Sequence, residues 1–150
     1  MSKFIYRMQN ILNIKYKLEE QAKTEFMLAN QILREEEEKL QNLKNRKLGY
    51  EEKVRSLFKN HLEVDRIKEN QEAIVRMREF IAAQTVCVND AKRQVEIKAA
   101  KLTELMQERK AQEKLKEKAF EKFLQEENAK ESKEIDELVS FTYGKKQREE

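Results

Sequence analysis

The chain has no proline, no tryptophan and only two glycines among its 150 residues. Chain reversals depend on glycine, proline, asparagine and similar residues, so this composition allows one or two reversals at most. A globular domain built from many short elements is therefore excluded. Charged residues make up 41% and apolar residues 39% of the chain. Glutamate, lysine, leucine, glutamine, arginine and alanine dominate, which is typical of long helices and coiled coils.

Cysteine and histidine are also nearly absent, with Cys87 and His61 the only ones. One cysteine cannot form an internal disulfide, and one histidine cannot supply a histidine-rich metal site. We expect His61 to be exposed near a bend and Cys87 to be a small buried or half-buried side chain. No glycine-rich phosphate loop is present. We predict a protein that is not an enzyme and that uses no cofactor and no metal.

Apolar residues recur at alternating steps of four and three, the heptad spacing of coiled coils. A strand would alternate with a period of two, which neither half of the chain does. We call each line of heptad positions a seam. The first seam contains Ala22, Phe26, Ala29, Leu33, Glu36, Leu40, Leu43, Lys47, Tyr50, Val54 and Leu57. The second seam contains Ile74, Met77, Ile81, Gln84, Val88, Ala91, Val95, Lys98, Leu102 and Leu105.

The heptad pattern is less regular toward both ends of the chain. Upstream of Ala22 the apolar residues follow a different phase, which predicts a register shift near Leu18. Those upstream residues are Met8, Ile11, Ile14 and Leu18. Beyond Leu105, the polar residues Arg109, Gln112 and Lys116 fall on the second seam. We therefore expect weaker pairing there.

Two seams, one in each half of the chain, can bury each other if the chain folds back on itself. We predict an all-α fold, an antiparallel two-helix coiled-coil hairpin that forms a single domain over 1–150. The first arm is expected over about 3–60, the bend over about 60–71, the second arm over about 72–142 and a frayed tail over 143–150. Asp65 or Asn70 is expected to cap the second arm, and Gly144 to end it. The alternative is one uninterrupted helical rod.

Charges of the two signs are interleaved, with 32 lysines and arginines against 29 aspartates and glutamates. This balance does not favour nucleic acid as a partner, although the more basic stretch from Arg109 to Lys122 leaves such binding open as a weak alternative. No apolar run approaches the about 20 residues that cross a bilayer, and the N-terminus lacks a secretory signal. We therefore expect a cytoplasmic protein.

Some apolar residues lie off the seams, including Phe4, Met27, Leu28 and Phe80. A helix with a single neighbour cannot cover all of them, so some should be exposed. Exposed apolar patches usually mark partner sites, and the competing interpretations are self-association or a wider seam.

Three segments resemble the FliJ family of flagellar type III export proteins. They are the aromatic, basic and apolar opening over 4–15, the start of the second arm over 76–81, and the C-terminal stretch over 123–127 and 133–138. The resemblance covers nearly the whole chain. It implies a non-enzymatic coiled-coil stalk in bacterial flagellum biogenesis, hence in motility and chemotaxis.

The resemblance also implies partners. They are the hexameric export ATPase, the cytoplasmic domain of the export gate and the export chaperones, with peripheral association at the inner membrane through the export apparatus. The ATPase end would include Met8, Leu12 and Phe123 together with the basic stretch, and the gate-facing surface Leu43, Tyr50 and Phe80. If the seam buries Leu43 and Tyr50 between the arms, they cannot also be the gate contact. The equivalent stalk of an injectisome and a generic coiled-coil scaffold remain alternatives.

Overall fold

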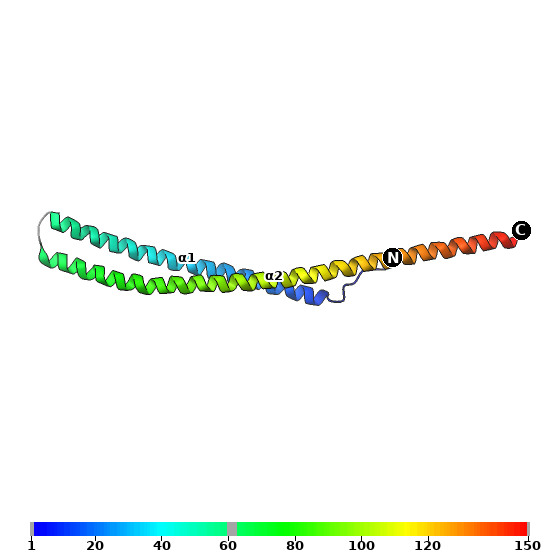
Figure 1. Cartoon of the computed structure of the whole chain (residues 1–150), viewed down its shortest axis with the longest axis horizontal. Helices are drawn as coiled ribbons and strands as arrows, with labels where there is room; N and C mark the ends of the chain where they lie inside the picture. The colour runs from blue at the N-terminus through cyan, green and yellow to red at the C-terminus, as the bar shows by residue number, and fades with distance from the viewer. Residues whose placement is uncertain (1, 60–62, 150) are drawn as a thin grey trace. The chain divides into compact units, whose positions relative to one another are not determined.

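The computed structural model describes residues 2–59 and 63–149, and within them it contains two helices and no strand. Helix α1 spans Gln9–Lys59, 51 residues, and helix α2 spans Val64–Glu149, 86 residues. Figure 1 shows the later part of α1 and the early part of α2 side by side, running in opposite directions. The predicted all-α, antiparallel two-helix hairpin is confirmed. His61 lies outside the described residues.

The start of α1 lies at Gln9 rather than near residue 3. The Gln9 N–H donates to the Tyr6 carbonyl at 3.2 Å, and the Leu12 N–H donates to the Met8 carbonyl at 3.1 Å. These bonds provide acceptors for N–H groups that the first turn of a helix leaves without an intrahelical partner. The segment 2–8 therefore leads into the helix without being part of it.

The start of α2 lies at Val64 rather than near residue 72, so the second arm begins earlier than predicted. The Ile67 N–H donates to the Glu63 carbonyl at 3.1 Å, which makes Glu63 the residue before the first turn. Asp65 lies within that turn, where its negative charge interacts favourably with the positive end of the helix dipole. Asn70 lies further inside the helix. Burial of the Ile67 side chain accounts for the earlier start.

The end of α2 also differs from the prediction. The helix continues through Gly144 to Glu149, and no described glycine has a positive φ. Gly144 is therefore an ordinary helical residue and not the left-handed cap that was expected. Lys146 and Arg148 lie in the last turn, where positive charge interacts favourably with the free carbonyl groups.

The chain divides into two compact units, and each helix contributes to both. Unit 1 consists of Met1–Glu19 and Leu105–Glu150, and unit 2 consists of Glu20–Glu104. We describe each unit by itself. The single domain over 1–150 stays a prediction.

In unit 2, every predicted seam position is buried or half-buried. This holds from Ala22 to Leu57 on α1 and from Ile74 to Leu102 on α2. Small and large side chains share the core, and its most buried members are Ala22, Ala29, Ile67, Ala73, Ile74, Met77, Val88 and Ala91. The heptad pattern therefore predicted every seam position of unit 2 correctly, and it missed the buried Ile67 and Ala73.

In unit 1, the predicted register shift near Leu18 is wrong. Apart from the half-buried Gln9 at the helix start, the covered residues of α1 in unit 1 are Leu12, Lys15 and Glu19, which lie at steps of three and four and keep the same heptad frame as Ala22. Ile11, Ile14 and Leu18 are exposed instead. On α2 the second seam also keeps its frame, because Leu105 is buried and Arg109, Gln112 and Lys116 are half-buried.

Candidate functional site

An aromatic cluster holds the N-terminal segment of unit 1 against α2. The ring centroid of Phe4 lies 5.2 Å from that of Phe120, edge to face, and 5.4 Å from that of Phe123. The Tyr6 hydroxyl also faces the Gln112 side-chain oxygen at 3.4 Å. Such aromatic pairs favour offset and edge-to-face geometry. Phe123, a predicted contact with the ATPase, is therefore half-buried beneath a segment of its own chain.

Two other predicted contacts with the ATPase have opposite environments. Leu12 is the most buried large side chain, 1% exposed, whereas Met8 is 39% exposed. In this packing the Leu12 side chain belongs to the core of unit 1 and is not available to a partner. Met8 is available.

A polar network occupies the seam of unit 1. Glu19 of α1 is only 3% exposed, and Arg109 of α2 donates to both of its carboxylate oxygens, with Nε–Oε2 at 2.5 Å and Nη2–Oε1 at 3.1 Å. The remaining guanidinium nitrogen, Nη1, donates to Glu113 at 3.1 Å. The Tyr16 hydroxyl donates to the other oxygen of Glu113. Lys15 and Glu108 form a further ion pair beside this network, at 2.9 Å.

The network shifts the pKa of three of its members. The hydrogen bond to Glu19 raises the pKa of Arg109 further above its already high value. The hydrogen bond from Tyr16 lowers the pKa of Glu113, and the same bond raises the pKa of Tyr16. Each shift favours the form that makes the bonds, namely a charged Arg109, a charged Glu113 and a neutral Tyr16.

The basic stretch of α2 separates into two parts. Two residues of the stretch are partly covered. Arg109 is ion-paired with Glu19, and Lys116 is half-buried in a shallow groove beside Phe4 and Phe120. The other lysines of the stretch are exposed and recur every four residues, so they form one row along the helix. They are Lys110, Lys114, Lys118 and Lys122. This lysine row is a positively charged feature of unit 1, and the exposed Glu117 and Glu121 lie between its members along the chain.

The predicted gate contacts in unit 2 also differ in exposure. Leu43 and Tyr50 are half-buried seam residues between the two helices, while Phe80 is 53% exposed. Lys53 lies over the Tyr50 ring at 5.9 Å from its centroid, within the range of a weak cation–π contact. Of these three residues, Phe80 alone is exposed.

Two polar seam residues meet in unit 2. The Gln84 side-chain amide donates to the Glu36 carbonyl at 2.9 Å and to the Glu36 carboxylate at 2.5 Å. This hydrogen bond from Gln84 lowers the pKa of Glu36. A second bridge between the helices, from Lys98 to Glu25, is more exposed and spans 3.3 Å. Two of the four non-apolar seam positions in unit 2, Glu36 and Gln84, are therefore partners of each other.

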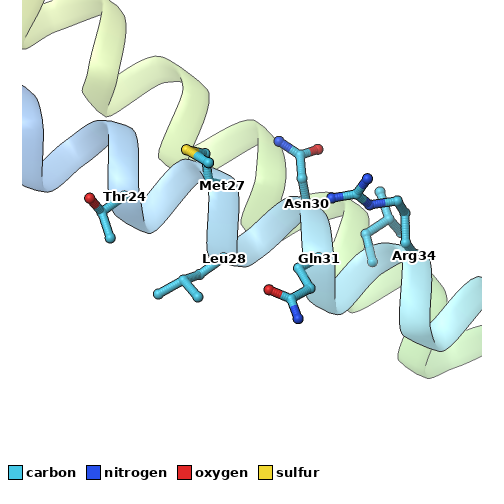
Figure 2. A pocket seen from close by; sticks show the side chains of 7 residues that line it. Thr24, Met27, Leu28, Asn30, Gln31 and Arg34 are labelled. Carbon is cyan, nitrogen blue, oxygen red and sulfur yellow. The ribbon is translucent and has the colours of Figure 1, made fainter.

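An apolar patch lies on α1 within unit 2. Met27, Leu28 and Ile32 are all more than half exposed. A shallow groove there is lined by Thr24, Met27, Leu28, Asn30, Gln31, Leu33 and Arg34, and Figure 2 shows Leu28 and Gln31 projecting from the same side of the helix. Exposure of Met27 and Leu28 agrees with the sequence argument. Ile32 was missed, although its position four residues after Leu28 gives the signal.

The described residues offer no cluster of three or more histidine, cysteine, aspartate or glutamate side chains that could hold a metal ion. Cys87 is exposed, in contrast to its expected burial. A search of the same residues finds no helix with the length and apolarity needed to cross a membrane.

A family model described as flagellar FliJ protein matches residues 3–148. This chain belongs to the FliJ family. The match covers both helices and both units. No curated protein matches the chain.

Among solved structures, one from Chlamydia trachomatis, described as a YscO homologue, has a TM-score of 0.71 to this FliJ-family chain. The two share 20% sequence identity, and the match covers 99% of this chain and all of the other. At this identity the likeness concerns the fold alone.

Proposed function

We propose that this FliJ-family protein is a non-enzymatic component of the flagellar type III export apparatus. It would act as a coiled-coil stalk that binds the hexameric export ATPase and the cytoplasmic domain of the export gate, and that assists export chaperones. It would work in the cytoplasm, at the membrane-embedded apparatus. The observation that carries the proposal is the family match over residues 3–148.

The ATPase contact is assigned to unit 1. Met8 is exposed, and the lysine row provides positive charge at every turn from Lys110 to Lys122. Exposed charges of one sign strengthen and orient association with an oppositely charged surface. A row along one helix can face successive subunits of a ring without a change in its own structure. Leu12 would support this surface from beneath.

The gate contact is assigned to unit 2, around Phe80. This side chain is aromatic and more than half exposed, which suits a residue that anchors a protein interface. Leu43 and Tyr50 are half-buried, so only the exposed parts of their side chains would contact the gate. The gate surface therefore centres on α2.

The equivalent stalk of an injectisome is the second candidate. It is favoured by the fold shared with a protein described as a YscO homologue. The two candidates differ in the ATPase that the protein recognises. Titration against the ATPases of both systems, with binding measured at equal ionic strength, separates them.

The test of the stalk proposal is a titration of the purified protein into the flagellar export ATPase. We expect more hexamer and faster ATP turnover, saturating near one chain per ring. The variant Lys114→Glu/Lys118→Glu should lose most of this stimulation. The matched control, Lys92→Glu/Lys101→Glu, makes the same charge change at exposed positions of α2 in unit 2 and should stimulate normally. Absence of both binding and stimulation by the unmodified protein would reject the proposal.

A further inference from the structure

The C-terminal part of α2 carries an apolar surface that unit 1 leaves uncovered. Every residue from Asn128 to Tyr143 is exposed. Five of them are large and apolar, with exposed fractions of 60–70%: Ile135, Leu138, Val139, Phe141 and Tyr143. The contrast with Phe123 is clear, because that side chain is half-buried by Phe4.

Three of these side chains, Ile135, Leu138 and Val139, form a stripe with helical spacing. Ile135, Leu138, Val139 and Thr142 lie at i, i+3, i+4 and i+7, which places them along one face of α2. A single helix gains most of its stability in water by packing such a face. The stripe therefore has the pattern of a helix that pairs with another helix.

The charges beside the stripe indicate what that other helix is. Four of the five charged residues from 131 to 137 are acidic, and the three charged residues from 144 to 148 are all basic. The apolar stripe lies between the acidic and the basic segment. A copy of the same helix running in the opposite direction would bring each acidic segment against a basic one. A parallel copy would place like charges together, which is unfavourable.

We propose that a second copy of this chain covers the stripe, antiparallel and centred near Ser140. In this register Glu134 of one copy lies near Lys146 of the other, and Leu138 lies near Thr142. The arrangement is two-fold symmetric, so each contact occurs twice. The proposal is independent of the ATPase assignment, because it concerns the purified chain alone.

The expected association is weak. The paired segments run from about residue 131 to 148, a helix of about 27 Å. Two such helices bury less than the roughly 1,000 Å² of a stable interface. We therefore expect a monomer at about 10 μM and a substantial dimer fraction as the concentration approaches about 1 mM.

Sedimentation equilibrium over this concentration range tests the proposal with a matched pair of variants. Val139→Asp should abolish the dimer. Val86→Asp alters the same residue type at nearly the same exposure, 60% against 62%, on the same helix in unit 2, and should leave the dimer unchanged. Both positions are exposed, so helix content by circular dichroism should be preserved. A chain that stays monomeric up to about 1 mM overturns the proposal.

Orientation is tested by cross-linking in a Cys87→Ser background. Mixing Glu134→Cys chains with Lys146→Cys chains should give mainly the mixed disulfide, and neither variant alone should cross-link efficiently. Efficient cross-linking of Glu134→Cys with itself would show a parallel pair and contradict the proposal. Protection of the stripe by the export ATPase with no dimer at any concentration would assign it to that protein instead, which also overturns the proposal.

Discussion

Glu19 of α1 and Arg109 of α2 form a two-point ion pair inside the seam of unit 1, with both carboxylate oxygens bound by the guanidinium group. Their side chains are 5% and 18% exposed. A two-point pair of guanidinium and carboxylate is geometrically specific, so a shift of one helix along the other by a full turn would break it. The pair therefore selects the register of unit 1, as buried polar residues do in other coiled coils.

Loss of one partner of this pair should be far more harmful than loss of both. Glu19→Ala should lower the free energy of unfolding by about 3 kcal/mol, because the largely buried Arg109 loses both of its bonds to Glu19. Glu19→Leu with Arg109→Leu should come close to the original stability. Glu25→Ala, which removes the exposed bridge to Lys98, is the control and should lower it by less than about 1 kcal/mol. Urea unfolding measures all three, and equal effects of Glu19→Ala and Glu25→Ala would contradict the register role.

Substitutions of Leu12 and Met8 should have different effects on stability, because Leu12 is buried and Met8 is exposed. Leu12→Ala removes a fully buried side chain and should lower the free energy of unfolding by about 3 kcal/mol. Met8→Ala alters an exposed residue and should change it by less than about 1 kcal/mol. Guanidinium unfolding gives both values. A small effect at Leu12 would mean that this residue is free for a partner after all.

The sequence predicted the hairpin because heptad spacing survives in both halves and few turn residues are present. It failed near the N-terminus for a physical reason. Lys15 and Glu19 occupy true seam positions, but they are charged, and single-sequence periodicity favours the apolar neighbours Ile14 and Leu18. The two bonds from Arg109 help to explain why a buried charge is tolerated at Glu19, and the sequence alone does not show them.

The candidate surfaces were less predictable than the fold. Heptad position correctly identified Leu43 and Tyr50 as seam residues, which conflicts with a role as fully exposed contacts. It could not show that the segment 2–8 continues along α2 so that Phe4 contacts Phe120 and Phe123, because that contact joins residues more than a hundred positions apart. The predicted end of α2 at Gly144 was wrong for a similar reason. A glycine caps a helix only where the chain turns there, and α2 continues through Gly144.

Stability should fall in mild acid because two glutamates have lowered pKa values. The bond from Tyr16 holds the pKa of Glu113 below the ordinary 4.5, and the bond from Gln84 does the same for Glu36. The unfolded chain therefore binds more protons than the folded chain in this range. The stabilisation is complete above about pH 4.5 and is lost as the pH falls through the lowered values.

Thermal unfolding from about pH 2 to 7 measures this loss. Glu113→Gln and Glu36→Gln should each flatten the acid side of the profile. Tyr16→Phe should do the same as Glu113→Gln, because it removes the donor that lowers the pKa. A profile unchanged by all three would contradict the role of these bonds.

Gly49 should be a site of easy stabilisation. It lies inside α1, and a Cβ atom placed there would meet nothing within 4 Å. Gly49→Ala should raise the free energy of unfolding by about 1 kcal/mol, because alanine restricts the unfolded chain and favours the helix. Gly144→Ala, near the end of α2, should give less. A decrease at Gly49, measured by thermal unfolding, would mean that this glycine serves a bend or a close contact with a partner.

The most direct test of the stalk account is the mass of the complex with the export ATPase, measured by native mass spectrometry in the presence of a non-hydrolysable nucleotide. The account predicts six ATPase subunits with a single copy of this chain, and loss of that species for Lys114→Glu/Lys118→Glu. A ring that carries six copies, or a ring that carries none at saturating protein, would contradict it.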